Sequence, residues 1–158
     1  MSTAMRSYEQ ARALVEEHLD EAEFESQPED RVARAERELG VRFPPSYRQF
    51  LLDLGAGGVG GEEIYGLVND DFEDVRPPQA VGLTREFRRD GQVSEDLVVI
   101  YNLGKGSYFA LDTRAAGDDG EAPVVAFTPG IHSAGDELQI VAPDFGAFFL
   151  ETVRADLG

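Results

Sequence analysis

The first third of the chain carries apolar residues three and four positions apart, which is the spacing of one face of an α-helix. This spacing predicts three helices, over residues 7–23, 28–39 and 44–54. Ser26 and Glu29 have the spacing of a capping box, so we expect the serine side chain to cap the second helix. Gly40 and Gly55 then end the second and third helices, because glycine leaves the helical conformation at little steric cost.

Runs of β-branched and aromatic residues, separated by glycine-containing turns, replace this spacing in the middle of the chain. They predict five strands, over residues 64–68, 97–101, 107–112, 123–127 and 138–141. Gly104 and Gly106 suit a tight antiparallel hairpin between the second and third of these strands. Residues 80–89 are predicted to form a short helix, and Asp144 is expected to cap a final helix. N-terminal helices, a mainly antiparallel central sheet and a C-terminal helix make an α+β fold, which we expect to be one domain over residues 1–158.

Residues 36–67 combine several short motifs of helix ends, turns and a strand. They are Leu39-Gly40, Pro44 or Pro45 with Tyr47, Phe50-Leu51, Gly57-Gly58, and Ile64 with Gly66-Leu67. This arrangement resembles the SMI1/KNR4 (SUKH) superfamily. Residues 98–112 are similar to the central hairpin of that family, and residues 144–150 to its closing helix, so the resemblance extends from about Glu36 to Leu150. Its motifs are structural and indicate the fold far better than any partner.

The charge of the chain is strongly acidic, with 31 Asp and Glu against 14 Lys and Arg and a formal net charge of −17. Such a field repels phosphate backbones and anionic membranes, so we expect no direct binding to nucleic acid or to a membrane surface. The same charge favours a basic protein partner. Lys105 is the only lysine, and an Arg-rich, acid-rich composition is explained equally well by a GC-rich genome or by a general demand for solubility.

The absence of cysteine excludes disulfides, thiolate nucleophiles and sulfur-ligated zinc. No stretch approaches the roughly 20 apolar residues of a membrane span. The first residues lack the uninterrupted apolar region of a signal peptide, so we expect a cytoplasmic protein. The sequence gives no indication of oligomeric state.

Three groups of residues invite a cofactor, metal or catalytic role, and the context of each is unfavourable. Gly55, Gly57 and Gly60 fit G-x-G-x-x-G, but this loop follows a helix and leads into a strand, the reverse of a dinucleotide site. The acidic residues 70–74 lack the alternating spacing of an EF-hand loop, so a solvated loop is favoured over a calcium site. His132-Ser133 is a histidine–hydroxyl pair, but adjacent residues rarely face one another as a base and a nucleophile must. We therefore expect no cofactor, no metal and no catalytic residue.

Other polar and aromatic residues have structural interpretations. His18 lies beside the apolar stripe of the first helix and is expected to pack or to cap. The basic cluster Arg85, Arg88 and Arg89 is interrupted by acids and indicates an ion-paired surface. Three aromatic residues of the central hairpin are expected to be core or half-buried sheet residues, with one tyrosine open to use as an interface anchor: Tyr101, Tyr108 and Phe109.

The resemblance implies a bacterial immunity protein, a non-enzymatic binding protein that blocks a cognate toxin of a polymorphic toxin system. Such toxins are commonly nucleases or other nucleic-acid-directed enzymes, and the acidic exterior would then occlude the toxin's polyanion-binding site. We expect the partner to be contacted by the strand after the glycine loop and by the acidic loop, through Glu62, Glu63, Tyr65, Asp70, Asp71, Glu73 and Asp74.

Two alternatives stay open. One is a regulatory scaffold that docks onto signalling proteins, like the eukaryotic members for which the family is named. The other, less favoured, is a metal-dependent enzyme that uses the acidic loop, since hard cations bind several carboxylate oxygens.

Overall fold

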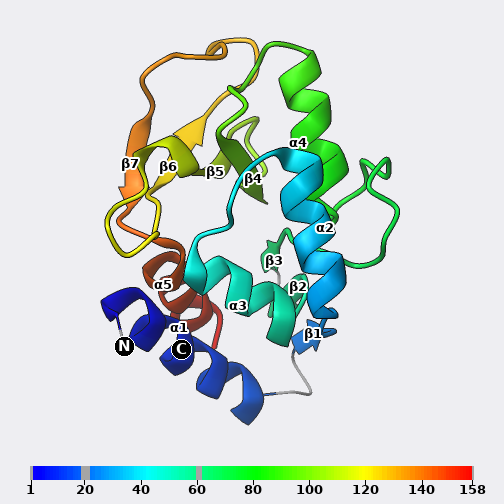
Figure 1. Ribbon diagram of the computed structural model, residues 1–158. Coiled ribbons are helices and arrows are strands. Elements are labelled where there is room, and N and C mark those ends of the chain that lie inside the picture. The colour runs from blue at the N-terminus through cyan, green and yellow to red at the C-terminus, as the bar shows by residue number, and fades with distance from the viewer. Residues whose placement is uncertain (1, 19–21, 60–61, 158) are drawn as a thin grey trace.

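The computed structural model describes residues 2–18, 22–59 and 62–157 (Figure 1). Its helices are α1 (Thr3–Glu17), α2 (Glu29–Leu39), α3 (Pro45–Asp53), α4 (Ala80–Arg89), the short 3₁₀ helix η2 (Thr113–Ala115) and α5 (Phe145–Leu157). Its strands are β1 (Ala22–Phe24), β2 (Gly57–Val59), β3 (Glu62–Ile64), β4 (Leu97–Asn102), β5 (Tyr108–Asp112), β6 (Val124–Phe127) and β7 (Gln139–Ala142). They form two antiparallel sheets, β1-β2-β3 and β4-β5-β6-β7. The α+β class is therefore confirmed.

The first helix lies earlier in the chain than predicted. It begins at Thr3 because the Ser2 side chain accepts a hydrogen bond from the Met5 N–H at 3.1 Å. It ends at Glu17, and the ring Nδ1 of His18 lies 3.0 Å from the Leu14 carbonyl oxygen, which confirms the expected capping role. The predicted end at residue 23 is wrong, because Ala22–Phe24 forms β1; residues 19–21 lie outside the described residues.

The second helix has no capping box. Pro28 is its N-cap and makes no side-chain hydrogen bond, so the role predicted for Ser26 is wrong. The neighbouring Gln27 is buried instead, and its side chain accepts from Arg31 at 2.6 Å. At the other end Gly40 has a φ of 67°, the left-handed conformation predicted for a glycine that closes a helix.

The three-stranded sheet is the part of the fold that the sequence pattern predicts least well. β2 lies within the glycine run and pairs with both β1 and β3. A Cβ at Gly58 would collide with the carbonyl oxygen of Glu62, so the tight β2–β3 pairing requires glycine there. The strand predicted over 64–68 is correct only at Ile64, because β3 spans Glu62–Ile64 and ends there.

Most residues of β4 and β6 are buried, so these strands are covered on both faces of the four-stranded sheet, whereas the edge strand β7 is mostly exposed. One face packs against the main core with α1, α3 and α5 through Val98, Ile100, Leu111 and Val124. The other face packs beneath α4 through Val99, Ala110, Val125 and Phe127 (Figure 1). The main core is rich in stacked and edge-on aromatic rings, among them Tyr8, Tyr47, Phe50, Phe145 and Phe149.

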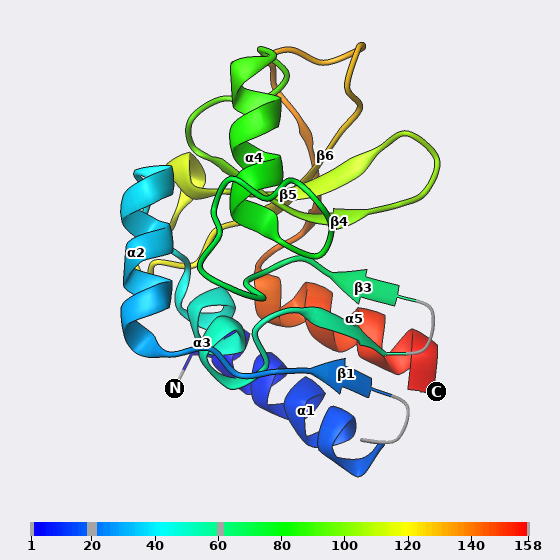
Figure 2. The ribbon, with the colours of Figure 1, turned by 90° about the vertical axis from the view of Figure 1, so that its right-hand side faces the viewer.

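The first and last helices lie side by side (Figure 2). Their backbones approach so closely that a Cβ at Gly146 would collide with the carbonyl oxygen of Ala4. The rings of Tyr8 and Phe149 stack at 6.0 Å across the same contact. Asp144 caps α5, since its Oδ1 accepts from the Ala147 N–H at 2.8 Å, as predicted.

Candidate functional site

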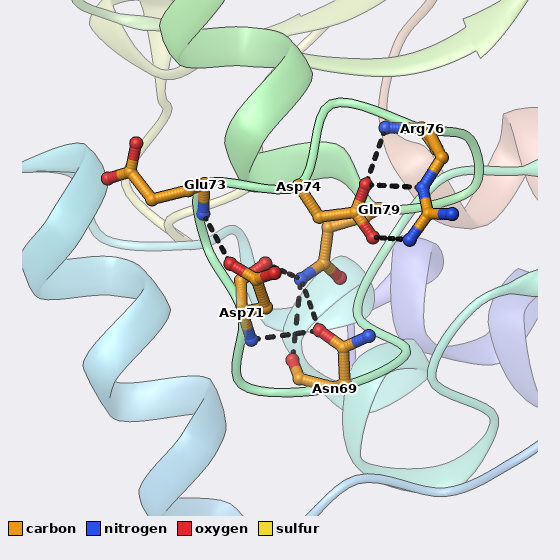
Figure 3. A network of polar contacts seen from close by, with 6 residues as sticks. All are labelled: Asn69, Asp71, Glu73, Asp74, Arg76 and Gln79. Carbon is orange, nitrogen blue, oxygen red and sulfur yellow. Dashed lines mark hydrogen bonds and ion pairs between the residues drawn. The ribbon is translucent and has the colours of Figure 1, made fainter.

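The acidic loop between β3 and α4 is organised around one buried glutamine. Gln79 is fully buried, and its amide nitrogen donates to the Asp71 carbonyl at 2.8 Å and to the Asn69 side chain at 3.2 Å (Figure 3). Its amide oxygen accepts from the Val68 N–H at 3.0 Å. The loop therefore has a fixed conformation and is more than a solvated run of acids.

The loop carboxylates are largely engaged within the molecule. Asp74 accepts from the Arg76 N–H at 2.9 Å and from its guanidinium at 3.0 and 3.1 Å, and these hydrogen bonds lower the pKa of Asp74 (Figure 3). Glu73 forms an ion pair with Arg85 at 3.0 Å. Asp71 accepts from the Glu73 N–H at 3.1 Å. Much of the negative charge in this loop is thus balanced locally, which reduces what it offers a partner.

The three predicted contact residues at β3 have different surroundings. The side chain of Tyr65 is only 3% exposed and packs in the core beneath α4, so its ring is not presented to a partner. Its backbone joins the two sheets, because its N–H donates to the Ile100 carbonyl at 2.8 Å. Glu63 is exposed and lines one hollow together with Pro78. Glu62 lines a second pocket, which lies next to α5. We therefore keep the two glutamates as candidates and assign Tyr65 to the fold.

The pocket next to α5 has a volume of about 350 Å³, and we call it the acid-rimmed pocket. Tyr101, Phe109 and Phe148 supply its aromatic floor. The rings of Tyr101 and Phe109 stack at 5.6 Å, and Phe148 lies edge-on to them at 5.4 and 5.7 Å. Three acidic residues of β3 and α5 line the same pocket: Glu62, Glu151 and Asp156.

The pocket is formed by one face of α5 and by β4 and β5, at a point where the pairing of these two strands is irregular. Five residues of α5 at helical spacing line it: Phe148, Glu151, Thr152, Ala155 and Asp156. Tyr101 of β4 and Phe109 of β5 are direct cross-strand partners. The pairing register shifts between Val99 and Tyr101, and Tyr101 consequently packs on the same side of the sheet as Ile100.

The rim carboxylates have no positive partner among the described residues, where Glu62, Glu151 and Asp156 form no ion pair. Oδ2 of Asp156 is sealed from water and makes no hydrogen bond within the described part of the chain, although the side chain as a whole is partly exposed. Burial raises the pKa of Asp156, and the charge of Glu62 raises it further. The pocket therefore combines an aromatic floor with uncompensated negative charge.

This pocket is the site that sequence reasoning missed. Of its acidic residues only Glu62 was predicted, and neither Glu151 nor Asp156 was. One signal was visible: the stripe at positions 148, 151, 152, 155 and 156 mixes aromatic, small and acidic residues on one face of the last helix. A face that is neither uniformly apolar nor uniformly polar is what a half-open pocket requires.

The remaining candidates have structural roles. Nδ1 of His132 accepts from the Thr128 N–H at 2.9 Å, so this ring nitrogen is occupied in holding its own loop. Arg85 pairs with Glu38 and Glu73, as predicted for an ion-paired surface. The same prediction is wrong for Arg88, which is half-buried and donates to the carbonyls of Leu39 and Leu97 at 2.8 and 3.2 Å. Tyr101, Tyr108 and Phe109 are half-buried on the sheet, as predicted.

Two properties of residues 2–18, 22–59 and 62–157 bear on the wider function. No cluster of three or more His, Asp or Glu residues there has the geometry to hold a metal ion, and these ranges include the acidic loop. None of the described helices combines the length and apolar character that crossing a bilayer requires.

Comparison with known families agrees with the motifs and with the fold. A family model, SUKH_5, described as SMI1-KNR4 cell-wall, matches residues 5–154. The match includes both sheets and most of α1 and α5. This chain belongs to the SMI1/KNR4 (SUKH) family.

Proposed function

We propose that this chain is a non-enzymatic immunity protein that acts in the bacterial cytoplasm and binds a basic protein toxin. In this proposal it occludes the surface with which the toxin, a nuclease or another nucleic-acid-directed enzyme, holds its polyanionic substrate. The observation that carries the proposal is a pocket with an aromatic floor, whose rim carboxylates have no ion-pair partner among the described residues. The chain is a family member with a net charge of −17.

The distribution of ion pairs supports a positively charged partner. Arg12, Arg48, Arg76 and Arg85 are each held by acidic side chains of the same chain. Part of the positive charge is thus used internally, while no described residue forms an ion pair with the rim of the acid-rimmed pocket. Opposite fields speed the encounter of two proteins and disfavour wrong partners.

The proposed contact surface centres on β3 and α5. Adjacent residues of β3 point toward different hollows, with Glu62 in the acid-rimmed pocket and Glu63 beside the acidic loop. α5 contributes Glu151 and Asp156. The acidic loop, which includes Asp70, is flanked by Val68 and Pro78 of the hollow beside Glu63, and it supplies a secondary contact in this proposal.

The test has two stages. The tagged chain is used to capture proteins from its source cell, and each captured protein is then expressed in a host with and without this chain. We expect a captured protein that stops growth or degrades nucleic acid alone and becomes harmless with this chain present. Harmless signalling proteins as the sole specific partners would contradict the proposal and favour a regulatory scaffold.

A metal-dependent enzyme is tested separately by calorimetry with calcium, magnesium and manganese. We expect only weak, salt-sensitive heats, because the loop acids bond to neighbouring groups and meet no metal-site geometry. Stoichiometric binding that is lost in Asp70→Asn or Asp71→Asn would contradict a purely binding role.

A further inference from the structure

We propose that the acid-rimmed pocket receives an arginine side chain of the protein partner, with the guanidinium plane against the aromatic floor and its N–H groups directed to Asp156 and Glu62. This inference rests on the proposed function, because a basic toxin supplies the arginine. It deepens that function by naming the chemical group that is recognised.

The floor of the pocket selects a flat cation. Tyr101 and Phe109 lie nearly parallel, with an angle of 27° between their rings, and Phe148 stands edge-on beside them. The negative face of an aromatic ring attracts a cation, and a guanidinium adds planar stacking and is weakly hydrated. An ammonium group is compact and strongly hydrated, so lysine gains less from the same floor.

The rim of the pocket supplies carboxylate acceptors that form no ion pair with any described residue. Oδ2 of Asp156 is closed to water, but the side chain as a whole is partly exposed, so its other oxygen and the carboxylate of Glu62 are the acceptors that a ligand can reach. The negative charge of Glu62 disfavours the ionised form of Asp156 when no cation is present. A cation between two carboxylates relieves their mutual repulsion and adds an attraction to each of them. A guanidinium has five N–H donors in a fixed fork and forms charge-assisted hydrogen bonds to carboxylates.

Other occupants fit the pocket less well. Among the described residues the rim carboxylates do not converge as metal ligands do. A phosphate or another anion would meet three carboxylates, and an apolar side chain would bury them without a partner. The volume of about 350 Å³ lies within the range of pockets that enclose a sizeable group.

The first test uses a model compound, so it does not require the toxin. The ¹⁵N-labelled protein is titrated with N-acetyl-arginine amide, and parallel titrations use the lysine amide and the nearly isosteric, uncharged citrulline amide. We expect the arginine amide to shift the backbone NMR signals of residues 101, 109 and 148–156 at millimolar concentration. Citrulline should bind at least about tenfold more weakly, since it lacks the charge.

Variants of the rim make the test specific. Asp156→Asn and Glu62→Gln are each expected to weaken the binding of the arginine amide by about tenfold, because each variant removes one charge-assisted contact. Glu137→Gln changes an exposed acid away from the pocket and should leave the binding unchanged. Equal binding of citrulline, signals that shift elsewhere, or insensitivity to both rim variants would overturn the inference. Thermal unfolding of each variant checks that the fold is intact.

Experiments with the captured toxin distinguish the arginine-binding inference from the proposed immunity function. If the toxin is neutralised equally well by Asp156→Asn and Glu62→Gln, the pocket inference fails and the immunity function stands. If the arginine amide binds the pocket but no toxin is captured, the immunity function fails and the pocket remains a guanidinium site. If the same variants bind both the amide and the toxin more weakly, the result supports both the pocket inference and the immunity function.

Discussion

The carboxylate of Glu121 caps α3 by accepting two hydrogen bonds from Ser46, one from the backbone N–H at 2.9 Å and one from the hydroxyl at 2.8 Å. Both residues are buried. The N-cap of this helix, Pro44, makes no side-chain hydrogen bond, so the capping acid comes from 75 residues further along the chain. A negative group at a helix N-terminus is favoured by the helix dipole. This contact ties α3 to the segment before β6.

Glu121→Ala is expected to lower the free energy of unfolding by about 2 kcal/mol, because the Ser46 N–H and hydroxyl lose a buried acceptor. Glu121→Gln should cost about half as much, since the amide oxygen still accepts one hydrogen bond. Urea denaturation of both variants measures the difference. Glu137→Gln, at an exposed acid, serves as the control. A Glu121→Ala variant as stable as the parent would refute the capping role.

Asp156→Asn is expected to increase the free energy of unfolding at pH 7 by up to about 1 kcal/mol. The effect is this small because the side chain is partly exposed and solvent screens its charge. Its pKa is raised in the folded state, so the native protein binds the proton more tightly than the unfolded chain does. The destabilising effect of ionised Asp156 is therefore present at neutral pH and disappears as pH falls through the raised pKa toward the ordinary value of 3.8.

Urea denaturation at pH 7 and near the ordinary Asp pKa, with Asp118→Asn as an exposed control, measures this difference. A stabilisation of the same size at both pH values would argue against titration of Asp156. Because the same variant is expected to bind arginine less well, the pocket would be an example of stability given up for recognition.

Gly66→Ala is expected to destabilise the protein by about 2 to 3 kcal/mol, the cost of overpacking a fixed site. A Cβ at Gly66 would collide with the carbonyl oxygen of Gly55, and the N–H of Gly66 donates to the Pro78 carbonyl at 2.8 Å. Gly117→Ala is a matched control, because its nearest neighbour would be a flexible Asp119 oxygen at 3.5 Å. Thermal unfolding compares the two; equal melting temperatures would contradict the packing argument.

Charge reversal should distinguish the two acidic surfaces in their contribution to toxin association. Glu62→Lys and Glu151→Lys are each expected to slow association about tenfold at low salt and less at high salt, as electrostatic steering predicts. Asp70→Lys, in the acidic loop, should have the smaller effect, since neighbouring loop acids are already balanced by arginine. Stopped-flow association rates over a range of ionic strength decide between them. A larger effect of Asp70→Lys would move the interface to the loop.

Most of the fold could be predicted because its signals are local. The apolar spacing of α2, α3 and α4 and the glycines of the β4–β5 hairpin each concern a few neighbouring residues. The three-stranded sheet escaped prediction because its strands are three residues long and its middle strand is built on glycine. Pairing of Phe24 with Gly57 joins distant backbone segments and leaves no pattern of side chains to recognise.

The site was only partly predictable for the same reason. Acidic residues clustered in the sequence, such as Asp70 and Asp71, drew attention to the loop, where hydrogen bonds and ion pairs occupy much of the charge. The carboxylates of the acid-rimmed pocket come from β3 and α5, which are far apart in the chain. Only the fold brings Glu62 to Asp156.

The side-by-side packing of α1 and α5 has a consequence for synthesis on the ribosome. α1 is made before α5, the helix that packs along it, so Tyr8 has no Phe149 to stack on until α5 has been synthesised. Contacts that join distant parts of a chain slow folding. During synthesis the side of α1 that faces α5 therefore stays open to solvent across all the intervening residues, and this part of the core closes only when α5 is present.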